Sequence, residues 1–307
     1  MPPFHPDLRA AARWLPRTLV NSWTVKLMRL LPSPGGKLPP GVTVNERALP
    51  SGARVRVLSP AEHSAPRPAV VWIHGGGYVI GHARQDDAFC GRLATELGAV
   101  VISVDYRLAP EAPFPAPLDD CFAAFVLLHH EAAVLGIDPT RVALAGQSAG
   151  GGLAAALAQR VRDSELPAPV FQLLIYPMLD DRTVLRDTGD RDVRVWSPAS
   201  NRLGWTAYLG CPPGAESVPD YTVPARRSDM RGLPPAWIGV GTNDLFHDED
   251  LAYAERLREA GVSVVVEVVP GAFHGFETVA PDAPVSRAFV QAQIDALAGA
   301  LGRPSGP

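Results

Sequence analysis

Short apolar runs alternate with longer amphipathic stretches along this chain from about residue 43 onward. The runs predict strands at residues 69–74, 99–105, 141–145, 170–176, 236–241 and 262–269. Several are apolar throughout, which is typical of parallel strands covered by helices on both faces. Helical patterns are found near residues 84–97, 116–135, 150–163, 248–260 and 285–300. The alternation predicts an α/β fold with a mostly parallel, doubly wound sheet.

Residues 1 to about 40 have a helical pattern of their own. Val20, Trp23, Leu27 and Leu30 recur at a spacing of three to four, and Pro32 then interrupts the pattern. We expect this segment to cover the protein's own pocket. Because it also has an excess of basic side chains, contact with anionic lipid is the alternative interpretation.

The interval between the strands at 170–176 and 236–241 breaks the alternation. It is rich in Arg, Asp and Pro, and it predicts a helix capped by Ser197 with Pro198 in its first turn. We interpret it as an inserted cap. Its aromatic side chains either line a pocket or form a small core of the cap itself; they are Trp196, Trp205, Tyr208 and Tyr221.

These patterns divide the chain into four segments. We expect an N-terminal cap segment at residues 1–42 and an inserted cap segment at 181–232. The two parts of the α/β core are expected at residues 43–180 and 233–307.

Composition excludes several classes of protein. The 307 residues have a net charge of −4, so the basic surface expected of a nucleic-acid-binding protein is missing. The three cysteines, Cys90, Cys121 and Cys211, are far apart and fit neither a disulfide framework nor a zinc site, so we expect free thiols. Basic residues interrupt the first thirty positions, which disfavours a signal peptide or a membrane span. We therefore expect a cytoplasmic protein without integral membrane contact.

Ser148 lies in the sequence Gly-Gln-Ser-Ala-Gly, between a predicted strand and a helix rich in small residues. A serine at such a turn is typical of the nucleophile elbow, where flanking glycines relieve crowding and the helix start directs its N–H groups toward the site. The alternative is a glycine-rich helix start with an incidental serine. A phosphate-binding loop is disfavoured because it requires a lysine that this segment lacks.

A second glycine-rich loop, residues 74–77, follows the strand at 69–74. Its consecutive glycines let backbone N–H groups turn inward, as an oxyanion hole requires. We expect the N–H groups of Gly76, Gly77 and Ala149 to bind the developing negative charge. His74, at the end of the strand, is interpreted as a structural residue that holds the loop.

Asp244 and His274 complete a candidate catalytic triad. Asp244 follows an apolar strand after a short turn, and the carboxyl ends of strands are where α/β sheets place their sites. His274 lies in a loop after the next strand, whereas His247 is too near Asp244 in sequence to be its partner. A turn aspartate and an ordinary loop histidine are the alternatives. The chain order Ser, Asp, His is that of α/β-hydrolases.

The chain resembles the bacterial hormone-sensitive-lipase-like carboxylesterases, also called family IV. The resemblance runs through HGGGYVIG at 74–81, DYRLAPEAPFPAP at 105–117, GQSAGGGLAA at 146–155, YPMLD at 176–180, GLPPA at 232–236 and GAFHGF at 271–276. It implies an α/β-hydrolase fold with a helical cap, no cofactor and no metal, and hydrolysis of short-to-medium acyl esters. The family's triad falls on Ser148, Asp244 and His274.

Three positions depart from the usual pattern of this family. Gln147 and Gly152 stand where members usually have Asp and Asn, and Leu245 stands where the family usually has Pro. The departures beside Ser148 bear on the shape of the pocket, and Leu245 bears on the turn after the acid.

The predicted function is that of a carboxylesterase that acts on a small-molecule ester through an acyl-enzyme. One alternative is another acyl hydrolase or an acyltransferase, with a lactone or an amide as substrate. The other is a small-molecule receptor that keeps the fold without catalysis. A homodimer is also expected, through an exposed last strand at residues 262–269.

Overall fold

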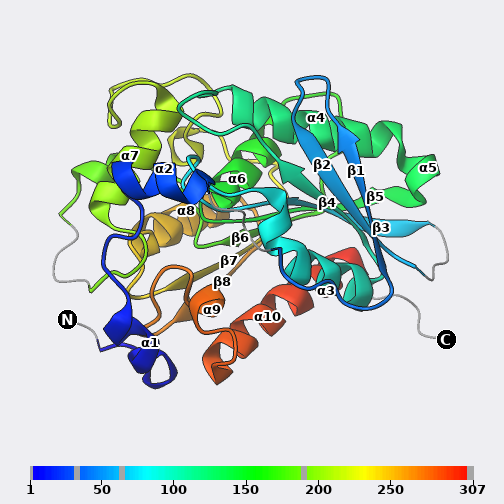
Figure 1. Ribbon diagram of the computed structural model, residues 1–307. Coiled ribbons are helices and arrows are strands. Elements are labelled where there is room, and N and C mark those ends of the chain that lie inside the picture. Colours follow the sequence, from blue (N-terminus) through cyan, green and yellow to red (C-terminus); the bar gives the residue numbers. More distant parts are fainter. Residues whose placement is uncertain (1–2, 31–34, 62–65, 188–191, 303–307) are drawn as a thin grey trace.

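An eight-stranded sheet forms the centre of the protein, in the order β1-β2-β4-β3-β5-β6-β7-β8 (Figure 1). The computed structural model describes residues 3–30, 35–61, 66–187 and 192–302. The strands are β1 Val42–Ala48, β2 Arg54–Pro60, β3 Arg67–Ile73, β4 Val100–Asp105, β5 Ile137–Gln147, β6 Phe171–Ile175, β7 Ala236–Gly241 and β8 Val264–Val269. Strands β3 to β8 pair in parallel, as predicted.

Strands β1 and β2 were not among the predicted ones. They form an antiparallel hairpin, and β2 pairs antiparallel with β4. The hairpin turns at Gly52, whose φ of +86° suits a residue without a side chain. Charged residues interrupt both strands, and β1 is mostly exposed. Neither strand therefore has the continuous apolar run that marks a strand in the middle of the sheet.

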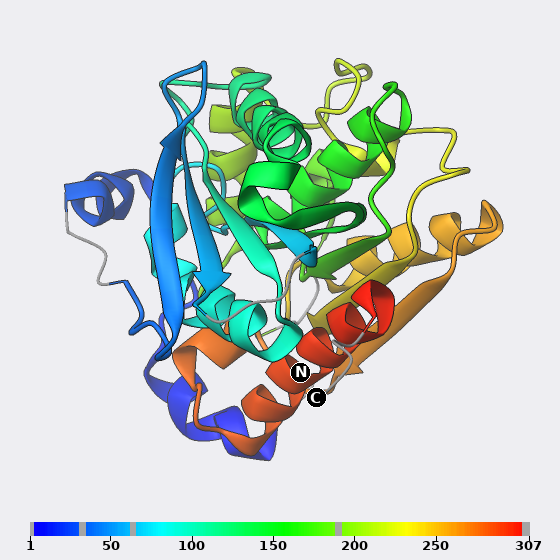
Figure 2. The ribbon, with the colours of Figure 1, turned by 90° about the vertical axis from the view of Figure 1, so that its right-hand side faces the viewer.

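Helices cover the two faces of the sheet as the pattern predicted. One face packs against α4, α6 and α8, and the other packs against α3 and α10 (Figure 2). Their bounds are α3 Asp87–Leu97, α4 Ala116–His130, α5 Ala132–Leu135, α6 Ala149–Arg162, α8 His247–Glu259, α9 Phe276–Val279 and α10 Pro284–Leu301, with a short 3-10 helix η2 at Ala83–Asp86. The single helix expected at 116–135 is divided at Glu131 into α4 and α5.

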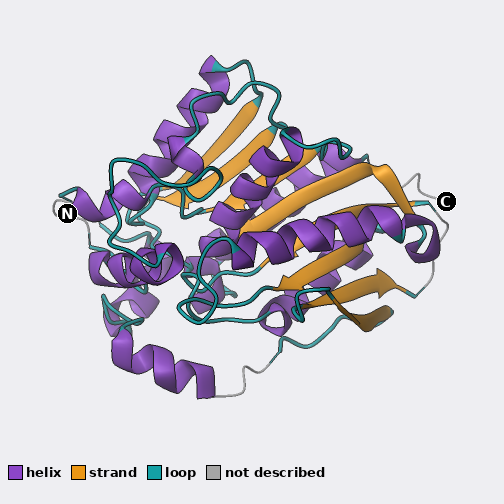
Figure 3. Ribbon diagram, turned by 90° about the horizontal axis from the view of Figure 1, so that it is seen from above, coloured by secondary structure: helices purple, strands orange, loops and turns teal. Residues whose placement is uncertain are grey.

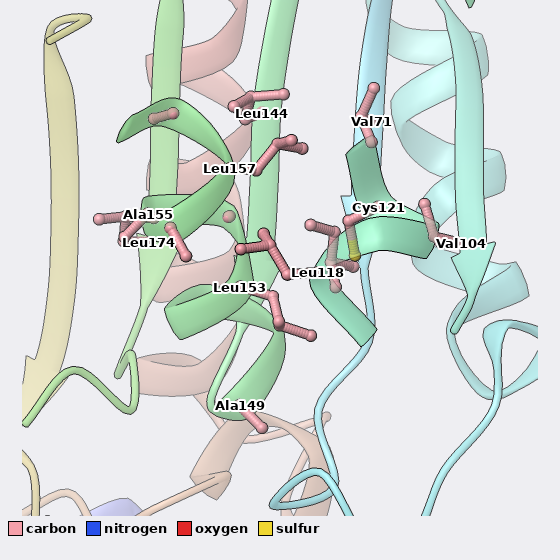
Figure 4. Packing of buried hydrophobic residues seen from close by; sticks show 14 of the residues in the cluster. Val71, Val104, Leu118, Cys121, Leu144, Ala149, Leu153, Ala155, Leu157 and Leu174 are labelled. Carbon is pink, nitrogen blue, oxygen red and sulfur yellow. The ribbon is translucent and has the colours of Figure 1, made fainter. Parts of the chain in front are cut away.

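Helix α6 is the part of the core that supports Ser148. Figure 4 shows Leu153 and Leu157 of this helix next to Leu144 of β5, in the same apolar cluster as Leu118 and Cys121 of α4. All five side chains are buried. Burial of such side chains contributes roughly 1.5–3 kcal/mol each, so the helix start after Ser148 is held firmly against the sheet.

The N-terminal prediction was right in part. The described residues before 40 contain the helices α1 Arg9–Trp14 and α2 Ser22–Leu30 and a 3-10 turn η1 Pro6–Leu8, not one continuous helical stretch. Of the four apolar side chains that suggested the helix, Val20 is buried, whereas Trp23, Leu27 and Leu30 are 83%, 58% and 81% exposed and do not face the protein. The inward face of α2 is instead formed by Val25 and Met28. Pro32 lies outside the described residues.

The inserted segment lies beside the N-terminal one. It contains η3 Asp181–Leu185, α7 Pro198–Leu209 and η4 Pro224–Arg226, and Figure 3 shows the helices and loops at this end of the sheet. Ser197 caps α7 through a bond from Ser200 N, as predicted. The Ser200 hydroxyl donates to the carbonyl of Val20 at 2.6 Å, which ties the two segments together. Their division from the core at the stated boundaries stays a prediction.

Across the described ranges, no helix has both the length and the apolar character needed to span a bilayer.

Candidate active site

Ser148 occupies a sharp turn between β5 and α6. Its φ of +55° is one that residues with side chains rarely adopt, so the backbone is strained there. The flanking glycines are required by space. A Cβ at Gly146 would lie 2.4 Å from the carbonyl oxygen of Gly150, and one at Gly150 would lie 2.1 Å from that of Ile73. The turn therefore has the geometry of a nucleophile elbow.

The three residues of the predicted triad form one chain of hydrogen bonds. His274 Nδ1 lies 2.8 Å from Asp244 Oδ2, and His274 Nε2 lies 2.9 Å from Ser148 Oγ. A carboxylate can only accept, so Nδ1 carries the proton and Nε2 accepts from the serine hydroxyl. Asp244 Oδ1 accepts a second bond, from the N–H of Phe246 at 2.9 Å. All three side chains are buried.

Aromatic rings surround the imidazole of His274. Tyr176 and Phe246 meet it edge to face, with ring centroids 4.6 and 5.3 Å away, and Trp196 lies 6.3 Å away. These contacts hold the ring in the plane that reaches both of its hydrogen-bond partners. The turn after Asp244, which has Leu245 in place of the family's Pro, still delivers the N–H of Phe246 to the carboxylate.

The loop after β3 turns sharply at two glycines next to Ser148. Gly76 and Gly77 have φ of +123° and +60°. A Cβ at Gly76 would lie 2.0 Å from the carbonyl oxygen of Ile80, and one at Gly77 would lie 2.0 Å from the Trp196 ring. Within the described part of the chain, the structure shows no hydrogen bond from either glycine's N–H. Ala149 is the first residue of α6, where an N–H has no partner in its own helix.

His74 is buried behind this loop. Its ring stacks on Tyr106 at 4.2 Å, and its Nδ1 donates to the carbonyl of Gly75 at 2.7 Å. Burial lowers the pKa of His74 to about 4, so the imidazole is neutral near pH 7. These contacts agree with the structural role predicted for it.

A cavity of about 460 Å³ opens in front of Ser148 and His274. Its walls are mostly apolar and come from both candidate cap segments. The N-terminal segment contributes Leu15, Leu19, Val20 and Met28, and the inserted segment contributes Val195 and Trp196. The size is that of sites for small organic molecules.

Of the four aromatic residues singled out in the inserted segment, one lines the cavity, two pack on the core and one lies elsewhere. Trp196 lines the cavity. Trp205 and Tyr208 are buried against Tyr78, with ring centroids 5.5 and 4.0 Å away. Tyr221 donates to Asp163 at 3.0 Å and does not border the cavity.

Sequence reasoning missed a buried acidic network behind the triad. Gln147 donates to Asp86 at 3.3 Å, and the Trp72 indole donates to the same carboxyl at 2.8 Å. The Tyr176 hydroxyl donates to Glu277. Burial raises the pKa of both carboxyl groups to about 7. Glu277 lies only three residues after His274 in the sequence, and this spacing is the signal that could have predicted its place near the site.

The network and the packing account for the two departures beside Ser148. A carboxylate at Gln147 would add a third acid next to Asp86 and Glu277, whereas the amide donates to Asp86 without a charge. At Gly152 a Cβ would lie 2.2 Å from the carbonyl oxygen of Met178 and 2.8 Å from the Tyr78 hydroxyl. The asparagine usual in the family does not fit there without a shift of the backbone.

No group of three or more His, Cys, Asp or Glu suited to a metal ion occurs among the residues that the structure describes. Cys90 and Cys121 are buried free thiols, and Cys211 is an exposed one.

Comparison with known proteins adds an independent line of evidence. Residues 70–278 match a family model described as the alpha/beta hydrolase fold. A carboxylesterase of Mycobacterium tuberculosis, NlhH, is 38% identical over 253 residues, which cover 80% of this chain and 78% of that one. An ethyl acetate hydrolase of Pseudomonas putida is 38% identical over 220 residues, which cover 68% and 65%.

Solved structures agree with these sequence matches. A bacterial heroin esterase has a TM-score of 0.87 at 37% identity, covering 97% of this chain and 98% of that one. An esterase from the archaeon Pyrobaculum calidifontis has a TM-score of 0.80 at 31% identity, covering 97% and 98%.

The chain therefore belongs to the α/β-hydrolase fold family. Within that family it is one of the hormone-sensitive-lipase-like carboxylesterases, and it is a carboxylic ester hydrolase.

Proposed function

We propose that the protein hydrolyses short-to-medium-chain acyl esters through a Ser148–His274–Asp244 triad and a covalent acyl-enzyme. The observation that carries the proposal is the continuous chain of buried hydrogen bonds from Ser148 Oγ to Asp244, which faces a mostly apolar cavity. A nucleophile, a base and a group that orients the base are all in contact.

In the acylation step, Ser148 Oγ attacks the ester carbonyl while its proton passes to His274 Nε2. Asp244 holds the imidazole in the required tautomer and stabilises its charged form. The carbonyl oxygen becomes negative and accepts hydrogen bonds from the N–H groups of Gly76, Gly77 and Ala149. Loss of one such donor typically costs about 3 kcal/mol of barrier. The intermediate collapses when the alcohol leaves with the proton from His274.

In the deacylation step, water takes the place of the alcohol. His274 removes a proton from the water as it attacks the acyl-enzyme carbonyl, and the same three N–H groups bind the second oxyanion. The proton then returns to Ser148 Oγ as the bond to the acyl group breaks. The carboxylic acid is released and the enzyme is restored.

The size and lining of the cavity support the choice of acyl group. A space of about 460 Å³ holds a small acyl group, and Leu19, Met28 and Trp196 give it apolar walls. The ethyl acetate hydrolase among the relatives is named for a small ester.

A series of p-nitrophenyl esters from acetyl to palmitoyl tests the proposal. We expect kcat/KM to be highest among the short-to-medium chains and to fall steeply toward palmitoyl. A Ser148→Ala variant measured beside it shows whether turnover depends on the triad. A maximum at palmitoyl, or no turnover of any member by the native protein, would contradict the substrate assignment.

The non-catalytic receptor finds no support in the geometry. Such a protein has no need of a serine hydroxyl bonded to a buried, oriented imidazole, as Ser148 is to His274. Lactones, amides and acyl acceptors other than water remain alternatives for the same site. Direct competition between a p-nitrophenyl ester and each of these substrates ranks them by kcat/KM.

We further propose that two copies pair through β8, which lies at the edge of the sheet. Val265 is 59% exposed on this strand, and an uncovered apolar edge favours pairing. Light scattering should show a dimer that Val265→Lys converts to a monomer. A native monomer at micromolar concentration would contradict this.

A further inference from the structure

Exposed apolar side chains are concentrated in a short stretch near the N-terminus. Five of the ten large exposed ones in the described part of the chain fall between residues 14 and 30; they are Trp14 (85%), Leu19 (36%), Trp23 (83%), Leu27 (58%) and Leu30 (81%). Trp72, Trp196, Trp205 and Trp237 are all buried. Large aromatic rings are seldom left exposed to water, so exposed apolar side chains gathered on one surface indicate a site that binds a protein or a membrane.

Three of these five side chains form one exposed face on α2, whereas Trp14 lies on α1, apart from it (Figure 1). Trp23, Leu27 and Leu30 are three and four residues apart, so they lie on one side of the helix. The inward side is supplied by Val25 and Met28, which pack on the core. The outer apolar face is therefore not needed to hold the helix on the protein.

The charge of this stretch is opposite to that of the whole chain. Residues 8–30 contain five basic residues and no acidic one, in a protein whose net charge is −4. Arg17 and Arg29 are paired with acids, whereas Arg9, Arg13 and Lys26 form no ion pair with any described residue. Arg9 and Arg13 lie on α1, apart from α2 (Figure 1), so Lys26 is the cation beside the apolar face of α2 that pairs with no described acid. An apolar helix face with such a cation beside it is the pattern of a helix that lies in the headgroup region of an anionic lipid surface.

A second copy of the chain is a poorer occupant. A two-fold symmetric contact between two α2 faces would bring Lys26 of each copy close to that of the other, and like charges oppose such a contact. An anionic lipid surface meets the cations and the apolar side chains at once.

The same stretch forms part of the catalytic cavity. Leu15, Leu19, Val20 and Met28 line the space in front of Ser148. A lipid surface in contact with the outer face of α2 would therefore lie close to this wall of the cavity. We propose that the N-terminal stretch with α2 docks the enzyme on anionic lipid surfaces, so that esters dissolved in the lipid reach Ser148. This rests on the ester hydrolase function proposed above.

Vesicle sedimentation with the full-length protein tests the docking. We expect binding to vesicles of phosphatidylglycerol and phosphatidylcholine at low salt, binding at least about tenfold weaker to phosphatidylcholine alone, and weakening with added salt. Tryptophan emission should shift to the blue on binding. The shift should come from Trp23 on α2, because Trp14 lies on α1, apart from α2 (Figure 1), and the other four tryptophans are already buried.

Two variants and a matched control locate the contact. Trp23→Ser combined with Leu27→Ser, and separately Lys26→Glu, should each weaken binding by about tenfold or more. Val134→Ser is the control. Its side chain is 81% exposed on α5, at the opposite end of the molecule from α2 (Figure 1), and binding should be unchanged.

Activity separates this proposal from the ester hydrolase function. All variants should hydrolyse soluble p-nitrophenyl acetate at the native rate, and only the α2 variants should lose turnover of an ester held in anionic vesicles. Equal binding to neutral and anionic vesicles, or binding that the α2 variants leave unchanged, would overturn the docking. So would light scattering that shows α2 holding a dimer together. If the native protein did not hydrolyse the soluble ester, the proposed ester hydrolase function would be overturned instead.

Discussion

The buried carboxyl groups behind His274 give single residues an influence on catalysis beyond the triad. Glu277 accepts from Tyr176, whose ring meets the imidazole, and the positive form of His274 favours an ionised Glu277. Burial nevertheless raises the pKa of Glu277 to about 7. The carboxyl is therefore ionised above about pH 7, and there it adds to the negative field of Asp244 that stabilises the imidazolium during reaction.

Glu277→Gln should lower turnover and shift the pH profile. The neutral amide still accepts from Tyr176, but it no longer favours the protonated imidazole. The acid limb of kcat/KM should therefore move to lower pH by up to about one unit. Plateau turnover should fall by up to about tenfold. A profile identical to that of the native enzyme would show that Glu277 exerts no field on the site.

Gly152 illustrates how packing fixes an unusual residue. Gly152→Asn restores the family's residue but brings a Cβ within 2.2 Å of the Met178 carbonyl oxygen. We expect a loss of about 1–3 kcal/mol in the free energy of unfolding, measured in urea. Gly299→Ala, in α10 where no atom lies within 4 Å of the added Cβ, is the control and should stabilise by up to about 1 kcal/mol. An unchanged Gly152→Asn midpoint would rule out the proposed clash.

The sequence predicted the residues whose chemistry follows from their local context. Ser148, Asp244 and His274 each come after an apolar strand, and parallel strands place their carboxyl ends at one edge. The network of Asp86, Gln147 and Glu277 could not be predicted, because it joins residues far apart in sequence whose burial no local pattern reveals.

At the scale of elements, α8 holds an acid that links stability to pH. Glu249 is buried and accepts from the N–H groups of Leu179 and Asp180 and from the Thr183 hydroxyl. Burial raises its pKa from 4.5 to about 8. Between these values the folded protein holds a proton that the unfolded chain has released. Stability should therefore fall as pH rises through this range.

Glu249→Gln should remove this part of the pH dependence. We expect the native free energy of unfolding to decrease by up to a few kcal/mol between pH 5 and pH 8 through this group. The glutamine at position 249 cannot ionise in this range, so the free energy of unfolding of the variant should decrease by correspondingly less. Glu255→Gln, an exposed position on the same helix, should behave as the native protein does. The test is to measure the free energy of unfolding in urea at several pH values. If it falls equally with pH in the native protein and in Glu249→Gln, Glu249 is not the source of the pH dependence.

Elements with strong patterns were predictable and the others were not. The central strands and their helices have continuous apolar runs or clear periodicity, so β3 to β8 were found. The hairpin β1–β2 is interrupted by charges such as Arg54 and Glu46, which pair with each other across it. Helix α2 was found, but its exposed face was mistaken for its buried one, because periodicity does not tell which partner an apolar face meets.

The arrangement of the whole molecule places the triad where sheet and candidate cap meet. The sheet delivers Ser148, Asp244 and His274 at one edge, while the N-terminal and inserted segments close the cavity above them. Hydrogen bonds between Thr18 and Ser197, and between Leu19 and Val195, join the two segments across a long separation in sequence. The cytoplasmic location expected from the sequence stays a prediction.

Because these bonds join the two segments, cutting one of them should loosen the cavity and leave the triad in place. Thr18→Val removes the hydroxyl that donates to Ser197 at 2.9 Å. We expect KM for a p-nitrophenyl ester to rise by about twofold to tenfold with little change in kcat. A fall in kcat at constant KM would instead show that this contact acts on the chemical step.

The proposed mechanism requires Ser148 to carry the acyl group. Rapid mixing with p-nitrophenyl acetate, followed by quenching and peptide mass spectrometry, tests it most directly. We expect a burst of p-nitrophenol close to one per active site, with acetate on the peptide that contains Ser148 and neither signal in Ser148→Ala. An acyl group on another residue, or turnover by Ser148→Ala within about tenfold of the native rate, would contradict it.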